Sequence, residues 1–201
     1  MRINTNAEWN RFKSSLAEEL RATPIEVFAA AWGGRKDKTG FYGSSLIPRI
    51  AQKCEMKVWY EFLRCDFALA NGEGVPLVFI ESENCHGSAS EEIEKLCCIA
   101  APVKVLFLSC SWHDSEREAW LGGWLQRIRK QHDLIEFESI YMVVVGEWGR
   151  GNPSDEVLRY YLESFGTDGK QLEPTIEIEI PNKTAGGDFE AHTASARFTL
   201  K

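Results

Sequence analysis

The chain has 201 residues, 44% of them hydrophobic, and it includes 7 Trp and 11 Phe. This length and apolar content predict a folded domain with a substantial core and exclude a disordered chain. No apolar run approaches the ~20 residues of a membrane helix, and the first residues lack a signal-peptide core, so we expect a cytoplasmic protein that does not enter a membrane. The net charge of −7 disfavours an extensive basic face, so any nucleic acid must be held locally.

Hydrophobic spacing predicts two helices at the start of the chain, over residues 7–21 and 25–32. The stretch 33–45 follows with four glycines and three basic residues, and we expect a flexible basic loop there. Its residue order is not that of a phosphate-binding P-loop. The basic residues 35–38, like the run 127–130 further on, can contact nucleic acid or form an ordinary solvated surface, which is the more common case.

From residue 56 onward, strand and helix patterns follow one another along the chain. Alternating or continuous apolar residues predict strands, and the capping-box spacing of Ser88 and Glu91 predicts a helix start. Asn152 and Pro153 predict the start of a further helix. The predicted strands cover residues 56–62, 64–70, 75–81, 103–108, 140–145, 175–180 and 196–200, and the predicted helices cover residues 88–101, 115–131 and 152–162.

The order of these elements predicts an α/β layer fold. The βαβ crossover in the middle of the chain gives parallel strands beside an antiparallel hairpin, so we expect a central mixed sheet flanked by helices. Residues 1–165 would form the domain, and residues 166–201 a C-terminal antiparallel appendage of it. That appendage can pack on the domain edge or pair with another copy, so a homodimer through the C-terminal strands is one interpretation.

The hairpin of residues 64–81 carries the main candidate site, because its Gly-rich turn at residues 71–74 would bring acidic side chains together. We expect Ala70 to face Leu77 across the ladder. The same register pairs Ala68 with Phe79, Asp66 with Glu81, and Arg64 with Glu83. A slip of one residue would send Asp66 to the other face of the sheet, so the site depends on this register.

Acidic side chains directly opposite each other destabilise a sheet, so without a cation this cluster would raise a pKa or push the strands apart. Mg²⁺ or Mn²⁺ would remove the conflict, since such a hard cation takes oxygen ligands from one or two carboxylates and leaves room for a phosphate. The alternative is that the acids are solvated and that Arg64 neutralises Glu83 as a surface pair worth about 0–1 kcal/mol. Cys85 and His86 lack a second ligand pair at zinc spacing, so we expect no zinc site.

A family resemblance extends this interpretation. The opening helix, the strand meander with Asp66, the segment Glu81-Ser82-Glu83-Asn84, the next helix and a buried strand resemble the PD-(D/E)xK superfamily of restriction-endonuclease-like nucleases. The resemblance covers residues 7–110 and implies a restriction-endonuclease-like αβββαβ core. It also implies Mg²⁺-dependent hydrolysis of phosphodiester bonds in nucleic acid, with DNA expected rather than RNA.

The resemblance assigns roles to five acidic residues. Asp66 and Glu81 would be the catalytic metal ligands. Glu19 in the first helix and Glu61 in the first strand would be further ligands that reach the same metal site. Glu83 stands where the family usually has Lys, and it would accept a proton from the attacking water or bind a second ion.

Some members of that family carry the Lys on the following helix, which here nominates Lys95 as a catalytic residue. Helical spacing favours the alternative of a surface pair between Lys95 and Glu91, on the face opposite Ile93 and Leu96. Two other functions stay open. The chain can be a nuclease-like fold that has lost catalysis and serves as a binding or regulatory module, or a member of another α/β family whose acids only form salt bridges.

Overall fold

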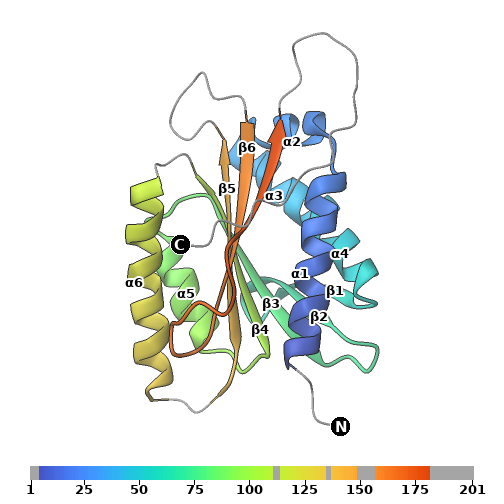
Figure 1. The fold of residues 1–201 in the computed structure, drawn as a ribbon. Coiled ribbons are helices and arrows are strands. Elements are labelled where there is room, and N and C mark those ends of the chain that lie inside the picture. Colours follow the sequence, from blue (N-terminus) through green and yellow to red (C-terminus); the bar gives the residue numbers. More distant parts are fainter. Residues whose placement is uncertain (1–4, 111–113, 135–136, 149–156, 182–201) are drawn as a thin grey trace.

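The computed structural model describes residues 5–110, 114–134, 137–148 and 157–181. In this part of the chain, a seven-stranded sheet lies between two layers of helices (Figure 1). The elements are, in chain order, α1 (Thr5–Ala22), α2 (Ile25–Ala31), α3 (Arg35–Phe41), a π-helical turn (Tyr42–Leu46), α4 (Ile47–Lys53), β1 (Lys57–Phe62), β2 (Cys65–Ala70), β3 (Pro76–Glu83), α5 (Ala89–Cys97), β4 (Val103–Cys110), α6 (Asp114–His132), β5 (Ile140–Trp148), β6 (Val157–Phe165) and β7 (Ile176–Pro181).

The strands lie side by side in the order in which they follow along the chain. The first three form an antiparallel meander, β3, β4 and β5 are parallel, and β6 and β7 are antiparallel again. The crossovers through α5 and α6 make the central pairs parallel. The predicted mixed α/β sheet flanked by helices is therefore confirmed.

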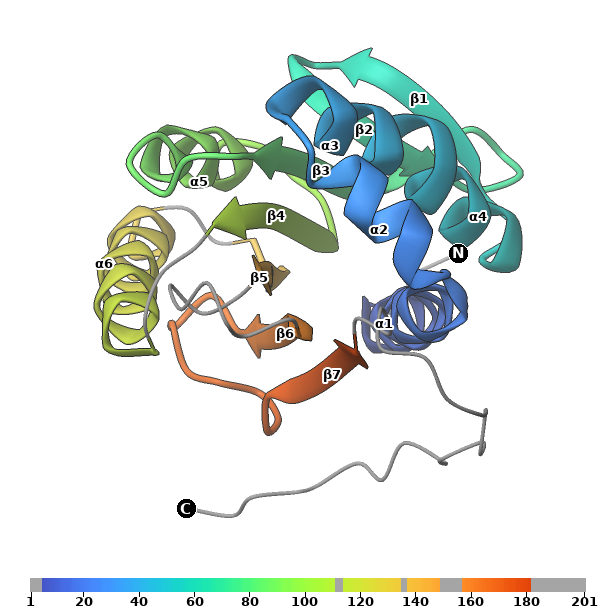
Figure 2. The same cartoon turned by 90° about the horizontal axis from the view of Figure 1, so that it is seen from above.

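Each face of the sheet has its own hydrophobic core. Helices α1 to α4 cover one face and α5 and α6 cover the other, as the view from above shows (Figure 2). Along β4, Val105 and Phe107 pack under the first group of helices, and Leu106 and Leu108 pack under the second. This two-sided burial explains why β4 is apolar without alternation.

The predicted helix over residues 152–162 is wrong. Residues 149–156 lie outside the described residues, but Val157–Phe165 form β6, which pairs with β5 from Leu158 to Phe165. Leu158 and Tyr160 face one core and Tyr161 and Phe165 the other. The segment forms a strand because its side chains are buried on both faces, whereas a surface helix would have a single apolar stripe.

The predicted flexible loop over residues 33–45 is also wrong. It contains helix α3 and the π-helical turn, which leads into helix α4, a helix that the sequence pattern did not indicate. Phe41 packs against Phe28, with ring centroids 5.3 Å apart, and Tyr42 packs against Phe107 at 5.1 Å. These buried aromatic contacts outweigh the weak helix propensity of the glycines.

The predicted strand 175–180 is confirmed as β7, whereas the predicted strand 196–200 lies outside the described residues. β7 pairs with β6 from Val157 to Leu162, so it extends the central sheet as an edge strand. None of the helices described here has the length and apolarity needed to cross a membrane.

Candidate functional site

The β2–β3 hairpin has the predicted register at its acidic end. Ala68 pairs with Phe79 and Phe67 pairs with Ile80. Extending this register by one pair sets Asp66 opposite Glu81. Near the turn, the pairing shifts between Leu69 and Ala70, so Ala70 faces Pro76, and the predicted pairing with Leu77 is wrong. This irregularity near the turn does not change the pairing at the acidic end of the hairpin.

Asp66 and Glu81 are joined through reciprocal hydrogen bonds between side chain and backbone. The Asp66 N–H donates to Glu81 Oε2 at 3.3 Å, and the Ser82 N–H donates to Asp66 Oδ2 at 2.8 Å. The Glu81 carboxylate therefore contacts the backbone of β2 at Asp66, and the Asp66 carboxylate contacts the backbone of β3 at Ser82, next to Glu81. The two residues lie side by side across the β2–β3 ladder, and their joint use as metal ligands stays a prediction.

Lys95 on α5 completes the cluster. Its Nζ lies 2.7 Å from Glu81 Oε1 and 2.5 Å from Glu92, and it donates to the Arg64 carbonyl at 3.1 Å. The favoured surface pair with Glu91 is therefore wrong. The Lys95 side chain is half-buried, because its aliphatic stem bends over the end of the hairpin and takes the amine to the nearly inaccessible Glu81.

Burial governs the protonation of both acids. Glu81 is 1% exposed, and burial raises its pKa to about 7 even though the Lys95 ammonium favours the carboxylate. The pKa of Asp66 is also raised, first by burial and then by the charge of Glu61, against the Ser82 hydrogen bond that lowers it. Repulsion between the two acids was the expected cause of a raised pKa, but burial is the main cause for both, and the charge of Asp66 is a smaller contribution to the pKa of Glu81.

Glu83 has a different environment. Its Oε1 accepts hydrogen bonds from the N–H groups of Asn84 at 2.6 Å and Cys85 at 3.0 Å, so it caps the turn that follows β3. Arg35 Nη2 lies 3.9 Å from the same oxygen. The predicted pairing of Glu83 with Arg64 does not form, because Arg64 lies in a left-handed turn, with φ of 67°, before β2 begins.

Of the two further acids, Glu61 lies near the cluster and Glu19 belongs to another. Glu61 and Asp66 line one cleft of about 720 Å³ together with Arg35 and Lys36 of α3. Glu19 is buried between α1 and α4, where Arg49 Nε lies 2.6 Å and Lys53 Nζ 3.0 Å from its carboxylate. These two cations lower the pKa of Glu19 against the effect of burial, which is the behaviour of a structural ion pair.

Asp66 and Glu81 are the two neighbouring carboxylates of the described residues that could hold a metal ion. Within the described ranges, no three His, Cys, Asp or Glu side chains converge to hold a metal ion. Asp66 and Glu81 supply two carboxylates, which is the number that Mg²⁺ commonly takes from a protein while it keeps several waters. Asp66 and Glu81 would therefore be the ligands, with Lys95 as the neighbouring cation.

Sequence reasoning missed the contribution of α3 to this region. Arg35 and Lys36 line the cleft that contains Asp66, and Lys38 lines a neighbouring pocket with Trp32 and Trp148. The basic run itself was the available signal, but only the folded helix shows that its side chains border two hollows.

Compared with known protein-family models and with curated protein sequences, the chain matches none.

Proposed function

We propose that the protein is a metal-dependent nuclease that hydrolyses phosphodiester bonds of nucleic acid, with DNA as the expected substrate, at the Asp66–Glu81–Lys95 cluster. The observation that carries the proposal is the contact of 2.7 Å between Lys95 Nζ and Glu81 Oε1, beside Asp66. This contact supplies from α5 the Lys that the strand lacks at Glu83. It supports the proposal even though Glu83 stands where the family usually has Lys.

The order of the elements supports the same proposal. An opening helical region, the meander β1–β2–β3, helix α5 and the parallel strand β4 follow one another as the αβββαβ core of restriction-endonuclease-like nucleases requires. The acids lie on β2 and β3 of this arrangement, and the amine comes from the helix that follows them. We therefore propose a restriction-endonuclease-like core for residues 7–110.

Each residue of the cluster has a definite task in this proposal. Asp66 and Glu81 would hold Mg²⁺ or Mn²⁺, which would polarise the scissile phosphate and lower the pKa of a bound water. Lys95 favours the ionised form of Glu81 against the effect of burial, and its ammonium can orient the attacking water or stabilise charge on the phosphate. Arg35 and Lys36, which line the same cleft as Asp66, can position the phosphate backbone.

A plasmid-nicking assay with Mn²⁺ tests this proposal. We expect cleavage by the wild-type protein and its loss in Glu81→Gln, since the amide neither carries charge nor binds a hard cation well. The thermal unfolding midpoint should stay the same or rise, because a crowded buried acid has gone while Lys95 keeps Glu92 as a partner. Glu73→Gln, at the exposed turn of the same hairpin, is the matched control and should cleave normally.

A second candidate function is a nuclease-like fold without catalysis, which binds nucleic acid or regulates a partner. It is favoured by the absence, in the described part of the chain, of a third acidic ligand beside Asp66 and Glu81. Titration calorimetry with Mn²⁺ separates the two candidates together with the nicking assay. Heat of binding that disappears in Asp66→Asn, without nicking by the wild type, would leave only the catalytically inactive form. Absence of heat in both proteins would leave only the salt-bridge interpretation.

A further inference from the structure

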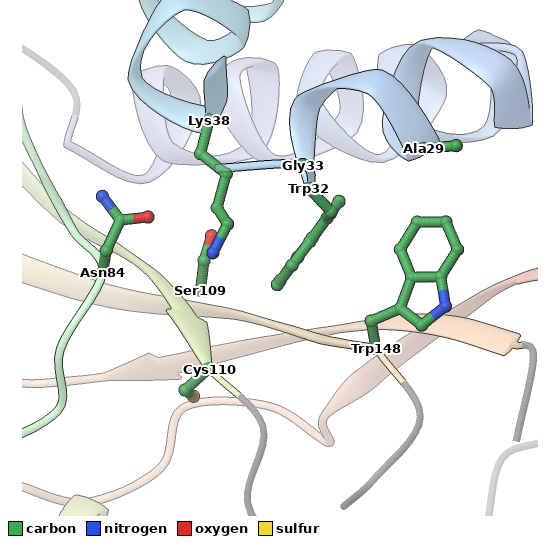
Figure 3. A pocket seen from close by; sticks show the side chains of 8 residues that line it. All are labelled: Ala29, Trp32, Gly33, Lys38, Asn84, Ser109, Cys110 and Trp148. Atoms are coloured by element: carbon green, nitrogen blue, oxygen red, sulfur yellow. The ribbon is translucent and has the colours of Figure 1, made fainter. Parts of the chain in front are cut away.

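A second hollow of about 630 Å³, here called the Trp–Lys pocket, lies at the carboxyl ends of the parallel strands (Figure 3). Asn84 directly after β3, Ser109 and Cys110 of β4, and Trp148 of β5 line its floor, and Trp32 and Lys38 close it from the helical side. Ligands of open α/β sheets bind outside the carboxyl ends of the strands. Asn84 is three residues from Glu81, so the pocket adjoins the proposed catalytic strand.

The chemistry of the Trp–Lys pocket combines one cation with aromatic faces. Lys38 extends into it between Asn84 and Trp32, and its Nζ lies 4.6 Å from the centroid of the Trp32 ring (Figure 3). The Trp32 and Trp148 rings stand 6.2 Å apart at 61°. No carboxylate among the described residues pairs with Lys38, and partial burial lowers the pKa of its amine. An anion in the pocket would relieve this desolvated charge.

Helix α3 connects the Trp–Lys pocket with the cleft that contains Asp66. Arg35 and Lys36 border that cleft, whereas Lys38 points into the pocket. A chain of phosphates that crosses α3 would therefore meet a cation on either side of the helix. Cationic side chains arranged in this way suit a chain of phosphates better than an isolated small molecule.

We propose that the Trp–Lys pocket holds one nucleotide of single-stranded nucleic acid, with its base against Trp148 and its phosphate on Lys38. The volume lies within the range of pockets that take one small ligand, and stacking on an aromatic ring tolerates any base. The proposal deepens the proposed function and rests on it for the position of the nucleotide relative to the cleaved bond. Binding itself requires neither metal nor cleavage.

Fluorescence anisotropy of a labelled thymidine octanucleotide in EDTA tests the pocket. Lys38→Gln should weaken binding and reduce the slope of log Kd against log salt concentration by about 0.7, the value for one lost phosphate contact of a single strand. Trp148→Leu should weaken binding by about 5- to 150-fold without changing this slope, since it removes stacking. Lys57→Gln on β1 and Trp59→Leu are the matched controls, and both should bind as the wild type does.

Three results would overturn the proposal: no binding by the wild type, equal binding by the wild type and both pocket variants, or equal affinity for thymidine monophosphate and the octanucleotide. The last result would make the pocket a mononucleotide site. Thermal unfolding of each variant shows that a lost affinity does not come from a lost fold. Because all measurements are made without metal and outside the acidic cluster, a failed nicking assay leaves them unaffected.

Discussion

Lys95 shows how far single residues could be predicted. The pairing at the acidic end of the hairpin was predictable from the alternation of β2 and β3, whereas the pairing next to the turn was not, because the register shifts between Leu69 and Ala70. The position of the Lys95 amine was not predictable, because a helical wheel gives the direction in which a side chain leaves the helix and not the course of a long, flexible side chain. The angle at which α5 crosses the sheet decides that, and it depends on tertiary packing. The ion pairs of Glu19 were also not predictable, because Arg49 and Lys53 lie on helix α4, which the sequence pattern did not indicate.

The pH dependence of cleavage should report the protonation of Glu81. A carboxyl must be ionised to bind a metal ion, and burial raises the pKa of Glu81 to about 7, so Mn²⁺-dependent cleavage should rise as the pH passes through about 7. Lys95→Met removes the cation that favours the carboxylate, so the pH of half-maximal Mn²⁺ binding should move upward. Nicking rates of the wild type and Mn²⁺ titration calorimetry of both proteins, measured from pH 5 to pH 9, check this. An unchanged midpoint in Lys95→Met would show that another group controls the profile.

At the scale of elements, segments with a clear apolar pattern were predicted, and segments whose local residues signal another structure were not. β4 and β5 were found because continuous apolar runs bounded by turns identify buried strands. The sequence predicts a helix in place of β6, because an Asn-Pro signal typical of a helix start precedes a segment whose two faces both pack into cores. Helix α3 was missed because Gly40 and the glycines on either side of the helix disfavour helical structure, whereas the packing of Phe41 and the following Tyr42 stabilises it.

The attachment of α6 to the sheet depends on Arg117. Its Nη1 lies 3.5 Å from Glu147 Oε1, its Nε lies 3.7 Å from Glu163 Oε1, and its guanidinium covers the Tyr161 ring at 3.7 Å. Arg117→Met should destabilise the protein by about 3 kcal/mol near pH 8, because two buried carboxylates lose a nearby cation. Urea unfolding measures the loss, and Arg129→Met near the exposed end of α6 should change stability by less than about 0.5 kcal/mol.

The loss in Arg117→Met should also depend on pH. Burial raises the pKa of Glu163 in the folded protein, and removal of the arginine raises it further. Protonated carboxyls do not need the cation, so the destabilisation should shrink as the pH falls through the raised pKa. A destabilisation that is equal at pH 5 and pH 8 would indicate that Arg117 acts through packing on Tyr161 alone.

For the whole molecule, the sequence predicts the fold class, and it gives the net charge directly. Apolar content and the order of elements indicated one mixed α/β sheet between helices, and that architecture is present. The extent of the sheet was not predictable, because β7 alternates like any solvated edge strand and its partner β6 was misread. The net charge of −7 remains the main constraint on how the molecule can approach a polyanion.

That charge limits the salt dependence of nucleic-acid binding. With contacts confined to Arg35, Lys36 and Lys38, about three phosphates are neutralised, so the slope of log affinity against log salt for a single strand should be about −2. Affinities of the octanucleotide between 50 and 300 mM KCl, measured in EDTA, give this slope. A slope steeper than about −4 would require a larger basic surface than α3 offers.

The left-handed residues Glu61, Leu63 and Arg64 at the end of β1 have a consequence for assembly. They twist this margin of the sheet out of the extended conformation, which obstructs the addition of a foreign strand. β7, at the opposite margin, is regular from Ile176 to Ile180. Of these two margins of the described sheet, that of β7 therefore favours recruitment of another copy, and such self-association would leave the cleft that contains Asp66 accessible.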